Sequence, residues 1–160
     1  MKPISIKLNS NKYINVIFLF YIFMLIKFSF WGIGTLSRMN ADYRNVLHNI
    51  TPFKSITNYL LNFDHYNFST WFYNTFGNVL LFLPLGILIT LVFVDVKHFR
   101  HVIYLSLFVS LIIEIAQFFT TLGVLDVDDI ILNTLGSILG FLILVLIKNK
   151  KLKYKGANIK

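Results

Sequence analysis

The sequence predicts an all-α integral membrane protein with four transmembrane helices. Only 14% of its 160 residues are charged, whereas soluble proteins have about a quarter. Hydrophobic residues make up 56% of the chain, and they fall in runs long enough to cross a bilayer. The net charge of +8 comes mainly from basic residues at the two tails, beside apolar runs. This pattern is typical of orientation in a membrane, and it argues against nucleic-acid binding, which needs a basic face.

The first predicted span covers residues 13–31 and follows a polar tail at 1–12. At about 1.5 Å per residue this run is long enough to cross the membrane. A cleaved signal peptide is the alternative interpretation, but it would have a shorter apolar core and a small-residue cleavage site. The run ends in Phe28-Ser-Phe-Trp31, which is a poor cleavage site, so a spanning helix is favoured.

A long loop is predicted at residues 32–73. After Pro52, apolar residues recur at helical spacing, at Phe53, Ile56, Leu60 and Phe63. This spacing favours a short amphipathic helix in the membrane interface. A loop packed over the helix ends is an equal alternative. Trp71, Phe72 and Tyr73 then form an aromatic belt of the kind found at membrane surfaces.

Three further spans are predicted at residues 74–94, 102–121 and 129–147, so that 13–147 forms a single membrane domain. Pro84 lies inside the second span, where it removes a backbone donor and should kink the helix. A basic tail follows at 148–160. Of the fifteen lysines and arginines, eleven lie in the two tails and the turn between the second and third spans. Both termini are therefore predicted to be cytoplasmic, and the long loop and the turn at 122–128 to face outward.

Polar side chains of three spans should meet in the outer half of the bilayer. Glu114 lies roughly 10 Å deep at 1.5 Å per residue, and an ionisable residue at that depth is a functional-site hypothesis. The predicted cluster consists of Asn78, Glu114, Gln117, Asp126, Asp128, Asp129 and Asn133.

Structural roles are the alternative for several of these residues. Asn78 and Gln117 could only join neighbouring helices. Asp128 or Asp129 could cap the fourth helix. Gly136 and Gly140 are spaced for close helix packing.

Two kinds of ligand fit these residue types. Asp126, Asp128 and Asp129 offer oxygen atoms that suit a divalent cation such as Ca²⁺ or Mg²⁺. Carboxylates together with Arg38 and Arg44 could instead hold a zwitterionic or phosphorylated headgroup. The absence of cysteine excludes disulfides and thiolate chemistry.

Four short motifs in order make the chain resemble the VanZ-like family of small membrane proteins. They are Asn49-Ile-Thr-Pro-Phe53, Asn78-Val-Leu-Leu-Phe-Leu-Pro-Leu-Gly86, Glu114-Ile-Ala-Gln117 and Asp126-Val-Asp-Asp-Ile-Ile-Leu-Asn-Thr-Leu-Gly136. The resemblance covers residues from about 40 to 145. It implies importance for Asn49, Pro52, Asn78, Pro84, Gly86, Glu114, Gln117, Asp126, Asp129, Asn133 and Gly136, with Arg44 as the match to a family arginine.

The resemblance implies a multi-pass protein of the bacterial cell membrane, linked to low-level resistance to the glycopeptide teicoplanin. We expect an outward polar pocket that engages a membrane lipid, a lipid-linked cell-wall precursor or the lipoglycopeptide itself. A membrane-embedded enzyme acting on a lipid-linked envelope substrate is the alternative, with Glu114 and Asp129 as acid, base or metal ligands. A small ion- or proton-coupled transporter is a third hypothesis.

Overall fold

A computed structural model describes residues 12–31, 48–93 and 98–157, with side chains placed as far as residue 150. Within these ranges, four helices are long and apolar enough to cross a membrane, and they lie at Lys12–Trp31, Phe68–Val92, Phe99–Phe119 and Val127–Lys150. They confirm the predicted all-α membrane fold. Arg38 and Arg44 lie outside the described residues, as do positions 1–11.

The first spanning helix, α1 (Lys12–Trp31), lies at the edge of the bundle. Only Leu25 among its side chains is fully buried, because the helix packs against its neighbours along one narrow stripe. The Tyr21 hydroxyl donates a 2.8 Å hydrogen bond to the carbonyl oxygen of Leu81. That carbonyl lies three residues before Pro84, which lies inside the continuous helix α5, so α1 anchors the second spanning helix near its proline.

The second spanning helix is built from three consecutive pieces, which are α4 (Phe68–Phe72), the π-helical η3 (Tyr73–Gly77) and α5 (Asn78–Val92). It begins six residues before the predicted start at Asn74. The reason is a local cap, because the Asn67 side chain accepts a 2.8 Å hydrogen bond from the backbone N–H of Thr70. Such a cap starts a helix in sequence that hydropathy alone assigns to the loop.

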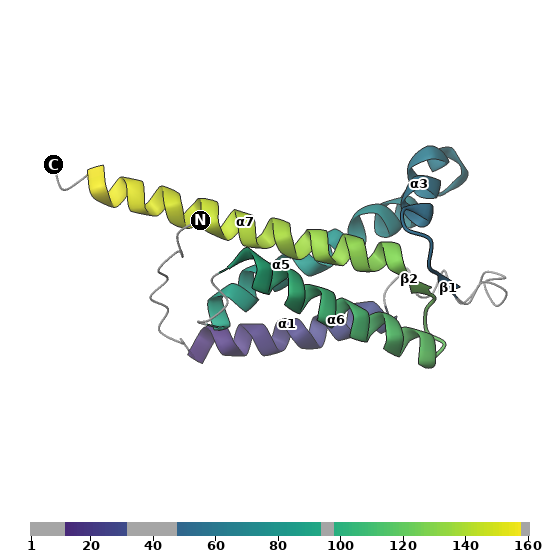
Figure 1. Cartoon of the computed structure of the whole chain (residues 1–160), viewed down its shortest axis with the longest axis horizontal. Helices are drawn as coiled ribbons and strands as arrows, with labels where there is room; N and C mark the ends of the chain where they lie inside the picture. Colours follow the sequence, from purple (N-terminus) through teal and green to yellow (C-terminus); the bar gives the residue numbers. More distant parts are fainter. Residues whose placement is uncertain (1–11, 32–47, 94–97, 158–160) are drawn as a thin grey trace.

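The third and fourth spanning helices are α6 (Phe99–Phe119) and α7 (Val127–Ala157). Figure 1 shows α7 running along the bundle and extending beyond the other helices toward its carboxyl end. Its 31 residues correspond to about 46 Å of helix, more than the roughly 30 Å of a hydrocarbon core. The predicted tail from residue 148 therefore continues as helix to Ala157.

Helices α5 and α7 approach each other closely because glycines stand at their contact. A Cβ atom added to Gly136 would fall on the carbonyl oxygen of Val79, and one added to Gly140 on that of Leu83. Gly86 of α5 meets the backbone of Ser137 in the same way. Small residues let membrane helices touch backbone to backbone, and here they fix the relative position of the two helices.

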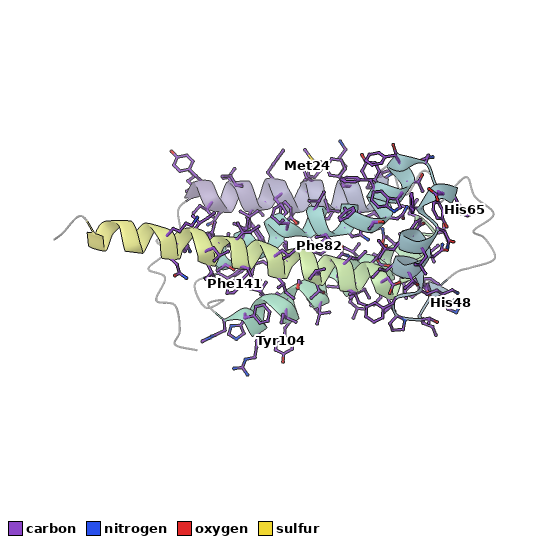
Figure 2. All side chains as sticks on the ribbon, turned by 90° about the horizontal axis from the view of Figure 1, so that it is seen from above. Met24, His48, His65, Phe82, Tyr104 and Phe141 are labelled. Carbon is purple, nitrogen blue, oxygen red and sulfur yellow. The ribbon has the colours of Figure 1, made fainter. Side chains whose placement is uncertain are left out.

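The apolar core lies between the four helices. Its buried members are Leu25, Phe82, Leu85, Ile89, Val102, Ile113 and Phe141. The outward faces are also apolar, and Figure 2 shows Tyr104 of α6 pointing away from the bundle. A helix bundle that is apolar inside and outside is suited to lipid surroundings.

The segment before the second spanning helix packs against the amino end of α7. Two-residue strands, β1 (His48–Asn49) and β2 (Leu125–Asp126), pair in parallel with Asn49 opposite Asp126. The helix α3 (Lys54–Leu61) and the 3₁₀ turn η2 (Phe63–His65) follow. Figure 1 shows α3, β1 and β2 at one end of the bundle, opposite the carboxyl end of α7. We call this the polar end.

A helix therefore forms in the long loop where apolar spacing predicted one. Phe53, Leu60 and Leu61 are exposed on and beside it. Its location in the membrane interface stays a prediction.

Candidate functional site

Asp128 caps helix α3 from a distant part of the chain. Its carboxylate accepts hydrogen bonds from the backbone N–H groups of Phe53, Ser55 (2.7 Å) and Ile56 (3.1 Å). The first N–H groups of a helix have no partner inside the helix, and a negative charge there is also favoured by the helix dipole. Asp128 is fully buried and is thus a structural residue of the polar end.

Asp126 holds the same segment and caps α7. Its carboxylate accepts hydrogen bonds from the Asn49 amide at 3.0 Å and the Ser55 hydroxyl at 2.6 Å. It also accepts the backbone N–H of Asp128 at 2.9 Å, which places it at the start of α7. All four carboxylate oxygens of Asp126 and Asp128 therefore have donors. We call Asn49, Ser55, Asp126 and Asp128 the cap network.

Asp128 and Asp129 both lie in the first turn of α7, where the sequence alternative placed a capping carboxylate at the positive end of the helix dipole. Asp128 caps α3, and the residue that caps α7 is Asp126. The divalent-cation hypothesis also finds no support in the cap network, because protein donors surround both carboxylates. Among the described residues, no group of three or more His, Cys, Asp and Glu side chains is placed to hold a metal ion.

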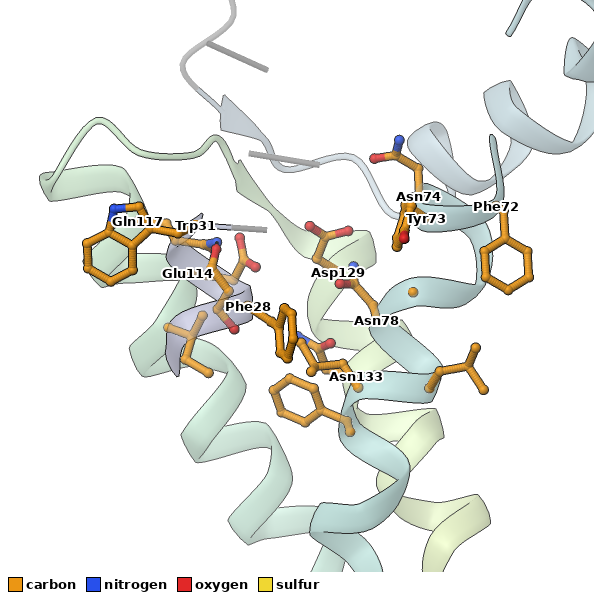
Figure 3. Close-up of a pocket in the computed structure, with 16 residues that line it drawn as sticks. Phe28, Trp31, Phe72, Tyr73, Asn74, Asn78, Glu114, Gln117, Asp129 and Asn133 are labelled. Atoms are coloured by element: carbon orange, nitrogen blue, oxygen red, sulfur yellow. Dashed lines mark hydrogen bonds between the residues drawn. The ribbon is translucent and has the colours of Figure 1, made fainter. Parts of the chain in front are cut away.

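A cavity of about 430 Å³ opens beside the cap network, between the four spanning helices. Figure 3 shows side chains from α1, η3, α5, α6 and α7 around it. Its polar lining consists of Ser29, Asn74, Asn78, Glu114, Gln117, Asp129 and Asn133. We call this space the polar cavity.

Glu114 links the polar cavity to the cap network. Its side chain is only 2% exposed, and one carboxylate oxygen accepts the backbone N–H of Asp126 at 3.0 Å. The same side chain lines the cavity. The carboxylate of Asp129 lines it as well and is also buried. Two acidic side chains therefore share one partly enclosed space.

Two amide side chains in the cavity, those of Gln117 and Asn133, each make one hydrogen bond and have one buried atom without a partner. The Gln117 amide nitrogen donates to the Ser29 carbonyl at 2.7 Å, and the Asn133 amide nitrogen donates to the Ser110 hydroxyl at 2.8 Å. The carbonyl oxygens of both amides are buried and have no hydrogen-bond partner. The Ser29 carbonyl can only accept, which fixes the orientation of the Gln117 amide, and because buried acceptors are nearly always satisfied in proteins, the Gln117 oxygen indicates a missing donor.

The remaining walls of the cavity are aromatic and aliphatic. Phe28 and Trp31 of α1 and Phe72 and Tyr73 of the second helix lie around it, as Figure 3 shows. Within the described part of the chain, no lysine, arginine or histidine lines it. The described lining of the polar cavity thus includes two carboxyl groups and several amide side chains, and it is bordered by apolar surface.

A smaller cavity of about 100 Å³ lies on the other side of Asn74 and Asp129, which line both spaces. The cap network forms much of its wall. The Asn49 amide oxygen, which has no hydrogen-bond partner, belongs to a residue that lines it. The two cavities together make the polar end a partly hollow region.

The structure brings most of the predicted site residues into these two groups. Asn78, Glu114, Gln117, Asp129 and Asn133 line the polar cavity, whereas Asn49, Asp126 and Asp128 belong to the cap network. Pro52 lies in the turn before α3, and Pro84 lies within α5. Gly86, Gly136 and Gly140 lie at the contact of α5 and α7.

Sequence reasoning missed two features of the site. Ser55 was not singled out, although it joins Asn49, Asp126 and Asp128. The aromatic residues of the belt were interpreted as membrane anchors, but Phe72 and Tyr73 also line the cavity. Their position directly before a spanning helix that carries Asn74 and Asn78 was the available sign that these rings lie near the polar cluster.

The fold and site define a small four-helix membrane protein with a buried acidic cavity at one end of its bundle. Residues 14–148 match the family model described as VanZ/LLP1, so the chain belongs to the VanZ-like family. It is similar to Protein VanZ of Enterococcus faecium, with 31% identity over 105 residues. That stretch is 66% of this chain and 55% of the relative, so the chain spans about half the length of that protein. No solved structure matches it.

Proposed function

We propose that this VanZ-like membrane protein contributes to teicoplanin resistance at the bacterial cell membrane through the polar cavity. The main supporting observation is that one cavity at the polar end of the bundle is lined by the polar side chains of Asn78, Glu114, Gln117, Asp129 and Asn133. Family membership supports the link to the envelope. The basic residues of the tails orient the polar end outward, where a drug or its membrane surroundings can be reached.

A polar cavity bordered by aromatic rings suits an amphiphilic partner. The polar lining would hold a headgroup, while Phe28 and Trp31, which are 54% and 66% exposed, face the surroundings of the bundle and would contact an acyl chain. Teicoplanin carries an acyl chain and vancomycin does not. A site at the membrane surface therefore accounts for an effect on one drug and not on the other.

An enzyme acting on a lipid-linked envelope substrate is the second candidate. The observation that favours it is that Glu114 and Asp129 line the same cavity, since a pair of carboxylates can supply an acid and a base. In that case the purified protein would convert such a substrate, and Glu114→Gln and Asp129→Asn would each abolish turnover.

The resistance proposal is tested by inhibitory concentrations of teicoplanin and vancomycin in a susceptible Gram-positive host. The host expresses the wild type, Glu114→Gln or Asp64→Asn at matched membrane levels. Asp64 is an exposed carboxylate of η2 and controls for the loss of a negative charge. We expect the wild type and Asp64→Asn to raise only the teicoplanin value and Glu114→Gln to lose the increase.

Two results would contradict the proposal in different ways. If the wild type changes neither value, this member does not confer resistance. If Glu114→Gln protects as well as the wild type, resistance does not depend on the acidic side chain of the polar cavity.

A further inference from the structure

We propose that the polar cavity binds the sugar headgroup of an uncharged glycolipid. The inference rests on the proposed function in taking the polar cavity as the binding site, and it adds the chemical class of the ligand. That class follows from three amide side chains that line one space, which are Asn78 of α5, Gln117 of α6 and Asn133 of α7. Figure 3 shows them around the cavity, each on a different helix.

The amide side chains supply the hydrogen-bonding groups that the protein leaves open in the cavity. The two carboxyl groups of the lining, those of Glu114 and Asp129, have partners within the protein. The Gln117 oxygen is buried without a partner, and its orientation is fixed because the amide nitrogen donates to the Ser29 carbonyl. One atom of the Asn133 amide is unpaired as well. A ligand of this cavity should therefore be recognised by amides.

Asn78 adds an amide with both kinds of group open. Its side chain is half-buried at the cavity wall, and within the described part of the chain it makes no hydrogen bond. A free amide offers two N–H donors and one carbonyl acceptor. Because Gln117 needs a donor and Asn78 offers both kinds of group, the ligand should both donate and accept. A hydroxyl group does both, whereas an ammonium group only donates and a phosphodiester only accepts.

The spread of the amides favours a sugar over a single hydroxyl group. Three helices each contribute one amide, so several hydroxyl groups on one compact ring are needed to reach them. Among the described residues, no lysine, arginine or histidine lines the cavity, and these are the side chains that hold a phosphate by charge. The volume of about 430 Å³ lies within the roughly 300–1,000 Å³ of small-molecule sites. The ligand is therefore uncharged and rich in hydroxyl groups.

The opening of the cavity indicates that the sugar belongs to a lipid. Four residues line the cavity and are also exposed, and they are Phe28 and Trp31 of α1 and Tyr73 and Leu80 of the second helix. The cavity therefore opens sideways between these two helices. Leu80 lies seven residues after Tyr73, so the opening extends along about 10 Å of helix. Acyl chains can lie along this apolar edge while the sugar ring packs against the aromatic walls.

The test measures lipid retention by the purified full-length protein with native mass spectrometry, in a detergent without hydroxyl groups such as dodecyldimethylamine oxide. Glucosyl diacylglycerol, phosphatidylglycerol, phosphatidylethanolamine and phosphatidylcholine with identical acyl chains are compared. Their headgroups carry, respectively, an uncharged sugar, a glycerol beside a phosphate, a primary ammonium and no hydrogen-bond donor. We expect glucosyl diacylglycerol to bind at least ten-fold better than each phospholipid, and free glucose to compete only at far higher concentration.

Variants locate the binding. Asn78→Leu and Gln117→Leu should each lower glucosyl diacylglycerol binding by about ten-fold without changing phosphatidylcholine binding. Asn149→Leu removes an exposed amide toward the carboxyl end of α7 and should change neither. Circular dichroism and thermal melting in the same detergent show which variants are folded. Asn78→Leu removes no hydrogen bond within the described ranges, so it decides the test if Gln117→Leu, which loses its bond to Ser29, fails to fold.

Equal binding of the four lipids, or unchanged glucosyl diacylglycerol binding by a folded Asn78→Leu protein, would overturn the inference. Preferential binding of phosphatidylglycerol or phosphatidylethanolamine would overturn the choice of an uncharged sugar. Free glucose competing as well as the glycolipid would overturn the assignment to a lipid. The assay contains no antibiotic, so its failure leaves the resistance proposal standing. A failed resistance test likewise leaves the lipid assay to decide this inference.

Discussion

The cap network and the polar cavity contain the same residue types, carboxylates and amides, but these side chains have different hydrogen-bond partners. In the cap network, all four carboxylate oxygens of Asp126 and Asp128 accept hydrogen bonds from the protein. In the polar cavity, the amide oxygens of Gln117 and Asn133 have no partner. The difference teaches that an acidic residue at the end of a membrane helix is structural where its acceptors are filled. The Asn49 amide oxygen of the cap network is unpaired as well, and Asn49 lines the smaller cavity, so the unpaired amides border the two cavities while the cap carboxylates are fully paired.

Gly136→Val should have the largest effect, because it removes the frame that positions both regions. A side chain at Gly136 meets the backbone of Val79, which cannot yield as a flexible side chain can. We expect no folded protein in detergent by size-exclusion chromatography. Gly77→Ala is the matched control, since a Cβ there meets only the Tyr73 side chain at 3.5 Å. A folded Gly136→Val protein would show that the two helices need not touch at this point.

Asp128→Ala should break the cap network and leave the cavity residues in place. Three backbone N–H groups lose their acceptor, so we expect the free energy of unfolding in detergent to fall by about 2–3 kcal/mol. Protease cleavage in the segment 48–67 should also increase. Asp64→Ala serves as the control and should change neither quantity. Unchanged protease resistance in Asp128→Ala would mean that other contacts hold α3.

Glu114→Gln should remove protection against teicoplanin while leaving the free energy of unfolding almost unchanged. The glutamine oxygen can still accept the N–H of Asp126 that Glu114 accepts, so the free energy of unfolding should change by less than about 1 kcal/mol. Protection against teicoplanin should nevertheless be lost. Denaturant unfolding and inhibitory concentrations measured on the same variant check both halves. A strongly destabilised protein would reassign Glu114 to the structural group.

Asn133→Leu should also change stability little, and with the opposite sign. The substitution removes a buried unpaired oxygen and fills its place with a side chain of similar size. It also loses the bond to Ser110, whose hydroxyl can turn to its own helix backbone. We expect stability to stay level or rise by about 1 kcal/mol while protection against teicoplanin falls, as is common when a binding residue is replaced by a packing residue. Denaturant unfolding and inhibitory concentrations measure the two effects, and a clear loss of stability would show that the Ser110 bond outweighs the unpaired amide atom.

The spanning helices could be predicted from the sequence because hydropathy reports them directly. Their ends could not, since they depend on local partners such as the Asn67 cap before α4. The carboxyl end of α7 was also missed, because hydropathy stops at the membrane surface while lysine-rich sequence continues a helix readily.

The polar cluster could be predicted from depth and helix face, and residues of three spans do line one cavity. The different roles of its aspartates, two in the cap network and one in the cavity, could not be predicted from the sequence. Asp128 contacts Ser55, 73 positions earlier in the chain, and Asn49 pairs with Asp126 through a two-residue strand. Neither spacing nor composition reports a contact between segments so far apart.

The π-helical segment η3 (Tyr73–Gly77) has a consequence for the length of the chain. On one side, α3 is fixed by Asp128, and on the other, α5 is fixed by its glycine contact with α7. A π-helical turn holds an additional residue within a helix. Loss of one residue here would therefore convert the π turn to α geometry without turning either fixed neighbour. The same loss within α5 before Gly86 would rotate Gly86 by about 100° away from α7, so this wide turn is where the second helix tolerates the loss of a residue.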